Sequence, residues 1–250
     1  MKRLNLIIVI ISLFLSACGS NSYLSKIPQS KMIIDGKLND WSGDLKYIED
    51  DKAAIGVKND QEFLYLCYTT AERNKIMLIF TSGFTVWLKP ENSKTLGFQF
   101  PVRSHDEPSG NFRTRKRSVF NSALLIKKYL KNHNEFLILN DDNFPLYGAK
   151  LSGNTGYSLG LGYQSGKFIY ELKIPFKTFS DKHIPIVKIP NKKLEIVFES
   201  GELESLLLGS RSSFPGGRGG RRGGLGAAGP RGGNFNIPEK IEISIYVNLN

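Results

Sequence analysis

Apolar and polar residues alternate over several stretches of the chain, with the period of two that is typical of β-strands. In the clearest stretch, near the C-terminus, the apolar positions are Ile241, Ile243, Ile245, Val247 and Leu249. The stretch from Phe168 to Ile174 alternates in the same way. A strand of this kind has one face in a core and the other outside it, as in an antiparallel sandwich.

Further strands are predicted where turn residues separate short apolar runs: 53–57, 63–68, 75–81, 84–88, 95–102, 136–139, 157–163 and 194–198. Only residues 118–131 predict a helix, with one face made of Val119, Phe120, Ala123, Leu124, Tyr129 and Leu130. Strands and helices do not alternate, which argues against a doubly wound parallel sheet. We predict an all-β fold, an antiparallel β-sandwich of about nine to eleven strands with one inserted helix.

The first residues predict a secretory signal rather than a membrane-spanning helix. Lys2 and Arg3 precede an apolar run, 6–15, that is broken only by a serine. A helix needs ~20 apolar residues to cross a bilayer, so this shorter run fits the apolar part of a signal peptide. Residues 15–18 resemble a bacterial lipobox: Ser16 and Ala17 are small, and Cys18 occupies the lipidated position.

The lipobox resemblance implies that Cys18 becomes the first mature residue and carries acyl chains such as palmitate. The alternative is an ordinary cleaved signal in which Cys18 is incidental. We expect a signal peptide over 1–17, a tether over 18–30 and one sandwich domain over 31–250. Gly19 follows Cys18 in place of the aspartate that marks inner-membrane retention, which favours the outer membrane or cell surface of a bacterial envelope.

The net charge of +11 comes from three short basic segments, and the rest of the chain is neutral. They are Lys2 with Arg3, the run 113–117, and a Gly/Arg-rich stretch, 209–233, that has five arginines and no acidic residue. A stretch so rich in glycine cannot bury a core, so we expect a flexible loop insertion over 209–234. A polyanion is its candidate ligand, without specific nucleic-acid recognition, and an insertion with no ligand is the alternative.

The composition leaves little for catalysis or a metal centre. The three histidines and two cysteines have no metal-ligand spacing. Residues 156–160 fit the G-x-S-x-G pattern of a hydrolase nucleophile, but no helix is predicted after the serine. We therefore expect no enzyme and no cofactor, with calcium at the oxygen-rich turn 140–143 as the one option left open. Cys67, within an apolar run, is expected to be buried and inert.

The segment from Ile34 to Trp41, with the sequence IDGKLNDW, resembles the opening signature of family-nine carbohydrate-binding modules and the wider group of DOMON-like sandwiches. Residues 57–66, 84–88 and 170–176 resemble later strands of that family, in the right order. The resemblance implies a single β-sandwich with a binding role rather than a catalytic one. The group also includes haem-binding proteins, so the fold alone does not choose the ligand.

The two tryptophans are the candidate ligand-binding residues. Trp41 is expected to cover one end of the core, with its indole N–H bonded to a nearby carbonyl, and direct ligand contact is the alternative. Trp87 is expected to face outward with Thr85 and Lys89, as a platform for a sugar ring, unless it packs beneath the helix at 118–131. The sugar site of the family uses two facing tryptophans, from which this chain departs if Trp41 is structural.

These features together predict an envelope-anchored, non-catalytic binding lipoprotein with a carbohydrate as the first candidate ligand. A structural or assembly lipoprotein that binds a protein partner is the alternative. A haem-binding sandwich is the third interpretation.

Overall fold

The computed structural model describes residues 22–102, 121–177, 184–201 and 239–250. Three features predicted from the sequence lie outside these residues: Cys18, the basic run 113–117 and the Gly/Arg-rich stretch 209–233. The anchor and both basic loops therefore stay predictions.

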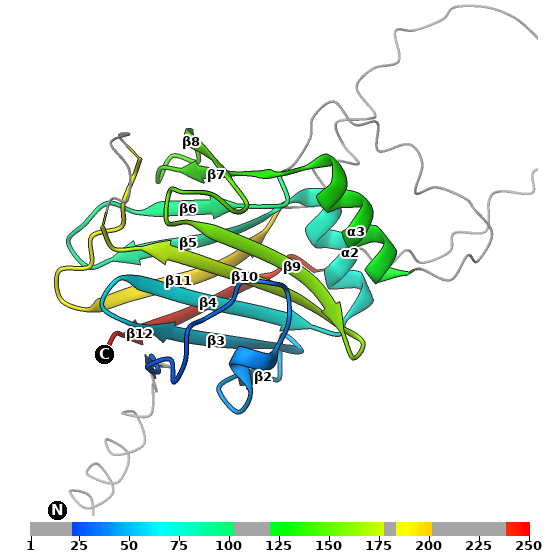
Figure 1. Ribbon diagram of the computed structural model, residues 1–250, viewed down its shortest axis with the longest axis horizontal. Coiled ribbons are helices and arrows are strands. Elements are labelled where there is room, and N and C mark those ends of the chain that lie inside the picture. Colours follow the sequence, from blue (N-terminus) through cyan, green and yellow to red (C-terminus); the bar gives the residue numbers. More distant parts are fainter. Residues whose placement is uncertain (1–21, 103–120, 178–183, 202–238) are drawn as a thin grey trace, which may run out of the picture.

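Two β-sheets form the body of the protein, one layer in front of the other in Figure 1. The seven-stranded sheet has the order β1 (Ser22–Leu24), β12 (Glu242–Asn248), β11 (Lys193–Ser200), β5 (Phe84–Pro90), β6 (Leu96–Gln99), β7 (Glu135–Leu139), β8 (Pro145–Lys150). The five-stranded sheet has the order β2 (Lys46–Ile48), β3 (Ala53–Asn59), β4 (Phe63–Thr70), β10 (Lys167–Pro175), β9 (Ser158–Gln164). Within these sheets every strand pair is antiparallel except β1 with β12, so the predicted antiparallel sandwich is confirmed.

The core lies between the sheets and is rich in aromatic rings. Tyr68 and Tyr170 from one sheet meet Phe84 and Phe198 from the other, with neighbouring ring centroids 5.0 to 6.4 Å apart. The alternate apolar positions of β12 point into this core and the intervening Glu242, Ser244 and Tyr246 are exposed, as the pattern predicts. Burial of one face of each sheet is thus the interaction that assembles the sandwich.

Residues 75–81 were predicted as a strand, and this prediction is wrong. They belong to α2 (Arg73–Ser82), which turns Ile76 and Ile79 toward the core. The run from Ile76 to Phe80 is continuously apolar, so its periodicity does not separate a strand from a helix. Gly83 ends the helix with a φ of 85°, and its N–H donates to the Ile79 carbonyl at 3.1 Å.

The predicted helix exists as α3 (Ser122–Asn132), but its buried side differs from the prediction. Ile126 is buried, whereas Leu124 is 63% exposed. Tyr129 and Leu130 pack against the core as expected, and Val119 and Phe120 lie outside the described residues. Figure 1 shows α2 and α3 together at one end of the sandwich, so the described chain has two inserted helices rather than one.

The described chain also has twelve strands rather than nine to eleven, because β1, β2 and β8 were not predicted. These three are edge strands whose side chains are mostly exposed, so they carry little of the apolar pattern that marks a strand. Among the described helices, none is long and apolar enough to cross a membrane.

One outer face of the sandwich is covered by the chain itself. A second apolar cluster forms on the outside of the five-stranded sheet, where Met32 and Trp41 pack on Tyr65, Cys67 and Ile169. Cys67 is completely buried there, as predicted, and burial raises the pKa of its thiol. On the other side of the sandwich, Trp87 and Lys89 of β5 line a hollow on the outer face of the seven-stranded sheet, and we call this the open face of the described residues.

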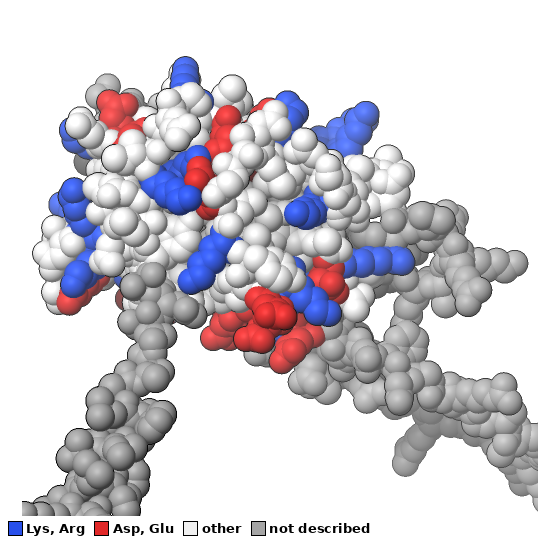
Figure 2. All heavy atoms as spheres, turned by 90° about the horizontal axis from the view of Figure 1, so that it is seen from below, with Lys and Arg blue, Asp and Glu red and all other residues white. Residues whose placement is uncertain are grey.

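Charged side chains of both signs share the described surface. Figure 2 shows lysines and arginines dispersed over the face seen from below, with the largest group of acidic side chains at its lower edge and smaller ones elsewhere.

Candidate functional site

The candidate site lies on the open face of the seven-stranded sheet, around its middle strand. In β5, Phe84, Val86 and Leu88 are buried in the core, so Trp87 points to the opposite face, as predicted. The strand register places Trp87 beside Val197 of β11 on one side and Gly97 of β6 on the other. A flat sheet surface with a central tryptophan is the base of the site.

The indole of Trp87 is held across three strands. A Cβ atom at Gly97 would lie 2.6 Å from ring carbon Cζ3, so the benzene half of the ring lies over this glycine. On the opposite side of the ring, Nε1 donates a hydrogen bond to Oε2 of Glu199 at 2.7 Å. The ring is half-buried. Gly97 has no side chain, so the ring lies close to the sheet while its outer face is left uncovered by this residue.

A hollow of about 350 Å³ opens over this ring. Its lining residues come from three strands and two loops: Trp87, Lys89, Thr95, Asp141, Val197, Glu199 and Glu242. None of them belongs to α3, so within the described chain Trp87 does not pack beneath that helix, which was the alternative position for it. The hollow combines one aromatic surface with a rim of charged and hydroxyl groups.

Ion pairs fix part of this rim. Lys240 bridges Glu199 and Glu242, with Nζ to oxygen distances of 2.6 and 3.1 Å. Lys89 lies 3.7 Å from Glu195 on the next strand. In the described part of the chain, the side chains of Thr95 and Asp141 have no hydrogen-bond partner, so they are available to a ligand.

Trp41 is not part of this site, because its side chain has no exposed surface. Its ring rests on Gly56 of β3, where a Cβ would approach ring carbon Cε3 to 2.5 Å. Its Nε1 donates to Oε1 of Glu171 at 2.7 Å, so its partner is a carboxylate and not the carbonyl expected from the sequence. A buried ring offers no face to a sugar, and we leave Trp41 out of the proposed site.

Glu171 holds the family-like signature in place. Its Oε2 accepts hydrogen bonds from the backbone N–H groups of Asp35 and Gly36, at 3.0 and 2.6 Å. Gly36 has a φ of 75°, and a side chain there would overlap the Leu161 carbonyl on β9. Burial raises the pKa of Glu171 to about 7, while its three N–H donors act in the opposite direction.

The oxygen-rich turn 140–143 is the connection between β7 and β8. Oδ1 of Asn140 accepts the N–H of Phe144 at 2.8 Å, and Asn143 adopts a left-handed φ of 61°. Among the described residues, no group of three or more His, Cys, Asp or Glu side chains is placed to hold a metal ion. The calcium option stays a prediction, and the contribution of this turn to the site is the Asp141 side chain.

The sequence predicted Trp87 as a site residue, but not Gly97 and Glu199, which hold its ring in place. Gly97 and Glu199 lie 10 and 112 residues away in the chain, and only the strand register brings them to the ring. The glycine at an otherwise apolar strand position was the one signal available, since an interior glycine marks close approach of another group.

Of the comparisons with known proteins, the one with solved structures gives matches. No family model matches the chain, and no curated protein matches its sequence. Among solved structures, the chain is similar to a family-nine carbohydrate-binding module from Caldicellulosiruptor kristjanssonii, described in complex with glucose. The similarity covers 72% of this chain and 78% of that one, at 10% identity and a TM-score of 0.33. The family is the one that the segment from Ile34 to Trp41 resembles, and the likeness concerns the fold alone.

The Glu171 network makes a pH-dependent prediction. The folded-state pKa of about 7 lies above the ordinary value of 4.5, so the folded protein holds this proton more tightly than the unfolded chain does. The resulting stabilisation is complete below pH ~4.5 and is lost as the pH rises through ~7, with a slope of up to about 1.4 kcal/mol per pH unit. Denaturant unfolding of the wild type and Glu171→Gln between pH 4.5 and 8 measures this effect. The difference between their free energies of unfolding should become smaller as the pH rises.

Glu171→Gln is also expected to destabilise the protein by about 1–3 kcal/mol, because its amide group faces N–H donors that need an acceptor. Glu135→Gln, at an exposed position of β7, is the matched control and should cost little. Equal stability of both variants at every pH would contradict this account of Glu171.

Proposed function

We propose that this protein is a non-catalytic, lipid-anchored envelope protein whose sandwich binds a carbohydrate on the open face of the seven-stranded sheet. The observation that carries the proposal is the placement of Trp87, half-buried over Gly97 and fixed by Glu199 in the floor of a hollow. A sugar ring has an apolar face of C–H groups and an edge of hydroxyls. The hollow offers a counterpart to each.

The aromatic floor provides the apolar contact. The indole is restrained on both sides, so little side-chain entropy is lost when a sugar ring packs on it. Around the ring, the carboxylates of Asp141 and Glu242 and the hydroxyl of Thr95 are acceptors or donors for sugar hydroxyls. A few polar groups around an apolar surface are the usual composition of a small-molecule site.

The charge of the rim favours an uncharged sugar. Three carboxylates line the hollow, those of Asp141, Glu199 and Glu242, against the single ammonium of Lys89. Lys240 offsets part of this negative charge through its two ion pairs. An acidic sugar would still meet more like charge than opposite charge, which opposes its binding. Neutral glycans are therefore the proposed ligand class.

The anchor is proposed from the lipobox-like residues before Cys18 and the short apolar run that precedes them. One acyl chain gives marginal membrane binding and two or more give a stable anchor, so a lipidated Cys18 with several chains would hold the sandwich at the envelope. The outer membrane or the cell surface is the proposed location. At either, a glycan-binding face would meet the sugars of the envelope or of the surroundings.

Trp87→Ala is the first test of the proposed site. We expect it to weaken binding of a neutral oligosaccharide by at least about 2 kcal/mol, roughly thirtyfold, because the ring is the floor of the hollow. Its cost in stability should be about 1–2 kcal/mol, below the ~3–5 kcal/mol of a fully buried aromatic, because the ring is only half-buried. A neutral-glycan array selects the oligosaccharide. Titration calorimetry then measures the binding free energy, and denaturant unfolding measures the stability.

Tyr47→Ala is the matched control, since Tyr47 is 62% exposed on β2 of the other sheet. It should leave both quantities nearly unchanged. Binding that survives in Trp87→Ala would place the sugar elsewhere. A wild-type protein that binds no glycan on the array would favour the alternative function, a lipoprotein that holds a protein partner.

Gly97→Ala tests the floor without removing the tryptophan. The added methyl group would lie 2.6 Å from the Trp87 ring, so the indole must tilt away from the sheet. We expect binding to weaken by about tenfold or more, although every group that contacts the sugar is still present. The same titration measures this effect.

Gly56→Ala is its counterpart on the covered face, where the methyl group would press on Trp41 at 2.5 Å. This variant should lower the stability of the fold and leave the affinity for the sugar unchanged. Unchanged affinity in Gly97→Ala would show that the position of the ring over Gly97 is not part of the site.

A further inference from the structure

The first described residues tie the N-terminal segment to both sheets. β1 runs parallel to β12, with Leu24 beside Asn248, and the N–H of Ser25 donates to the Asn248 carbonyl at 3.0 Å. The next residue crosses to the other sheet, where the N–H of Lys26 donates to the Val57 carbonyl at 3.1 Å. The segment therefore closes the sandwich at the edge where the two sheets meet.

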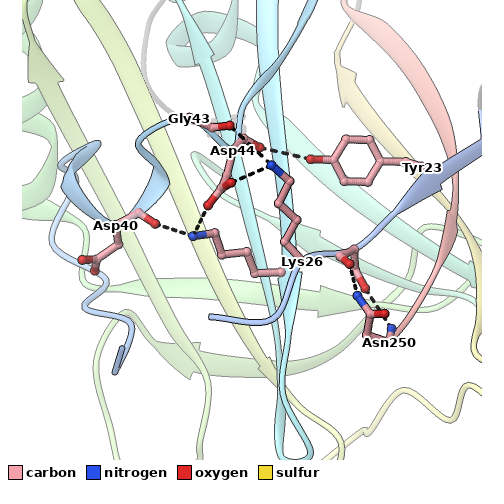
Figure 3. Close-up of polar contacts among 8 residues, drawn as sticks. Tyr23, Lys26, Asp40, Gly43, Asp44 and Asn250 are labelled. Carbon is pink, nitrogen blue, oxygen red and sulfur yellow. Dashed lines mark hydrogen bonds and ion pairs between the residues drawn. The ribbon is translucent and has the colours of Figure 1, made fainter. Parts of the chain in front are cut away.

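Side-chain contacts reinforce this attachment (Figure 3). Nζ of Lys26 pairs with Oδ1 of Asp44 at 2.7 Å, and the hydroxyl of Tyr23 donates to the Asp44 carbonyl at 3.1 Å. The backbone N–H of Asn250, the last residue, donates to Oγ of Ser25 at 3.0 Å. The chain is thus fixed to the body from β1 onward, and both of its described ends lie at the same place.

This attachment limits the distance between the body and the proposed lipid. Cys18 precedes Ser22, the first residue of β1, by four positions. Four residues of fully extended chain span at most ~14 Å. A lipid on Cys18 would therefore bring this end of the sandwich to the surface of the bilayer, with α2 and α3 at the opposite end (Figure 1).

The same end presents apolar side chains to the outside. Leu24 and Ile27 are 64% and 65% exposed, although water is an unfavourable surrounding for both. Beside Ile27 lies a hollow of about 640 Å³ whose apolar lining is Ile27, Phe176, Val187, Ile189 and Leu249. Exposed apolar groups that gather around a hollow mark an interaction surface.

Polar groups complete this surface. Lys188 and Lys192 line the hollow, and lysine stems can lie along an apolar surface while their ammonium groups reach phosphates. Asp60 lines it too and offsets one of the two lysines, so the lining has only a small net charge. Apolar contact rather than charge is then the main source of attraction.

We propose that this end of the sandwich, centred on Leu24 and Ile27, rests in the headgroup region of the bilayer as a second membrane contact beside the lipid. The inference relies on the lipid anchor of the proposed function, and it is independent of sugar binding. It sets the orientation of the molecule: the strands rise from the membrane, and the open face around Trp87 looks sideways from the sandwich.

A polarity-sensitive dye at position 27 tests the contact. Ile27→Cys places a reactive thiol at the exposed site, whereas Cys67 is buried and Cys18 is blocked by its lipid. Leu124→Cys is the matched control, because Leu124 is 63% exposed on α3, at the opposite end of the sandwich (Figure 1). Leu24→Cys serves as an independent second position. The full lipoprotein, purified in detergent, is labelled with the dye NBD and reconstituted into liposomes of phosphatidylethanolamine and phosphatidylglycerol.

We expect the dye at 27 and at 24 to shift to the blue on reconstitution and to be quenched by a lipid-borne quencher, and the dye at 124 to do neither. No shift at 27 and 24 in an anchored protein would overturn the inference, and so would equal shifts at all three positions. Mass spectrometry of the mature N-terminus reads the anchor separately: an unlipidated Cys18 overturns both the anchor and this contact. Glycan titration of the same samples reports on the sugar site alone.

Discussion

The buried carboxylate of Glu171 holds the N-terminal segment of the protein against the outside of the five-stranded sheet. Three N–H donors converge on it, from the Trp41 indole and from the backbone of Asp35 and Gly36. A charged group removed from water is costly unless it is fully hydrogen-bonded, so these donors and the carboxylate require one another. The contact covers one face of the sandwich, whereas the face around Trp87 has no comparable cover among the described residues.

The two tryptophans show how one local arrangement serves two purposes. Each lies over a glycine of a neighbouring strand, and each donates its indole N–H to a glutamate at 2.7 Å. Trp41 is sealed by the segment that contains it, so it stabilises the fold. Trp87 has no such cover among the described residues, so the same restraint leaves a rigid aromatic surface for a ligand. The difference between core and candidate site lies in what covers the ring.

Much of the fold follows from alternation in the sequence. The apolar sides of β10 and β12 and the outward direction of Trp87 were predicted because one strand face is buried in a continuous core. The helix α2 was not, because a continuous apolar run fits a helix and a buried strand equally well. The polar side of β10 was expected to be exposed, and this was wrong for Glu171. The N-terminal segment lies over it and buries it, which no pattern within the strand reveals.

The residues that hold Trp87 in place could not be predicted from the sequence, because strand register brings them to the ring. Glu199 and Gly97 reach Trp87 only through pairing between strands that are distant in the chain, and Asp141 reaches the hollow through a turn that reads as an isolated polar sequence. Alternation within one strand predicts which face of the sheet a side chain points to. The residues that it meets there belong to other strands, and the sheet topology decides which ones they are. The N-terminal attachment is of the same kind, since Ser25 meets Asn250 from the other end of the chain.

The open-face site is the central claim, and the indole signals of the protein test it most directly. The chain has two tryptophans, so a ¹H–¹⁵N spectrum contains two indole N–H resonances, which the Trp87→Ala variant assigns. During titration with a neutral oligosaccharide, the account predicts a saturable shift of the Trp87 resonance and an unchanged Trp41 resonance. A shift of the Trp41 resonance alone, or saturating sugar binding that moves neither resonance, would contradict it.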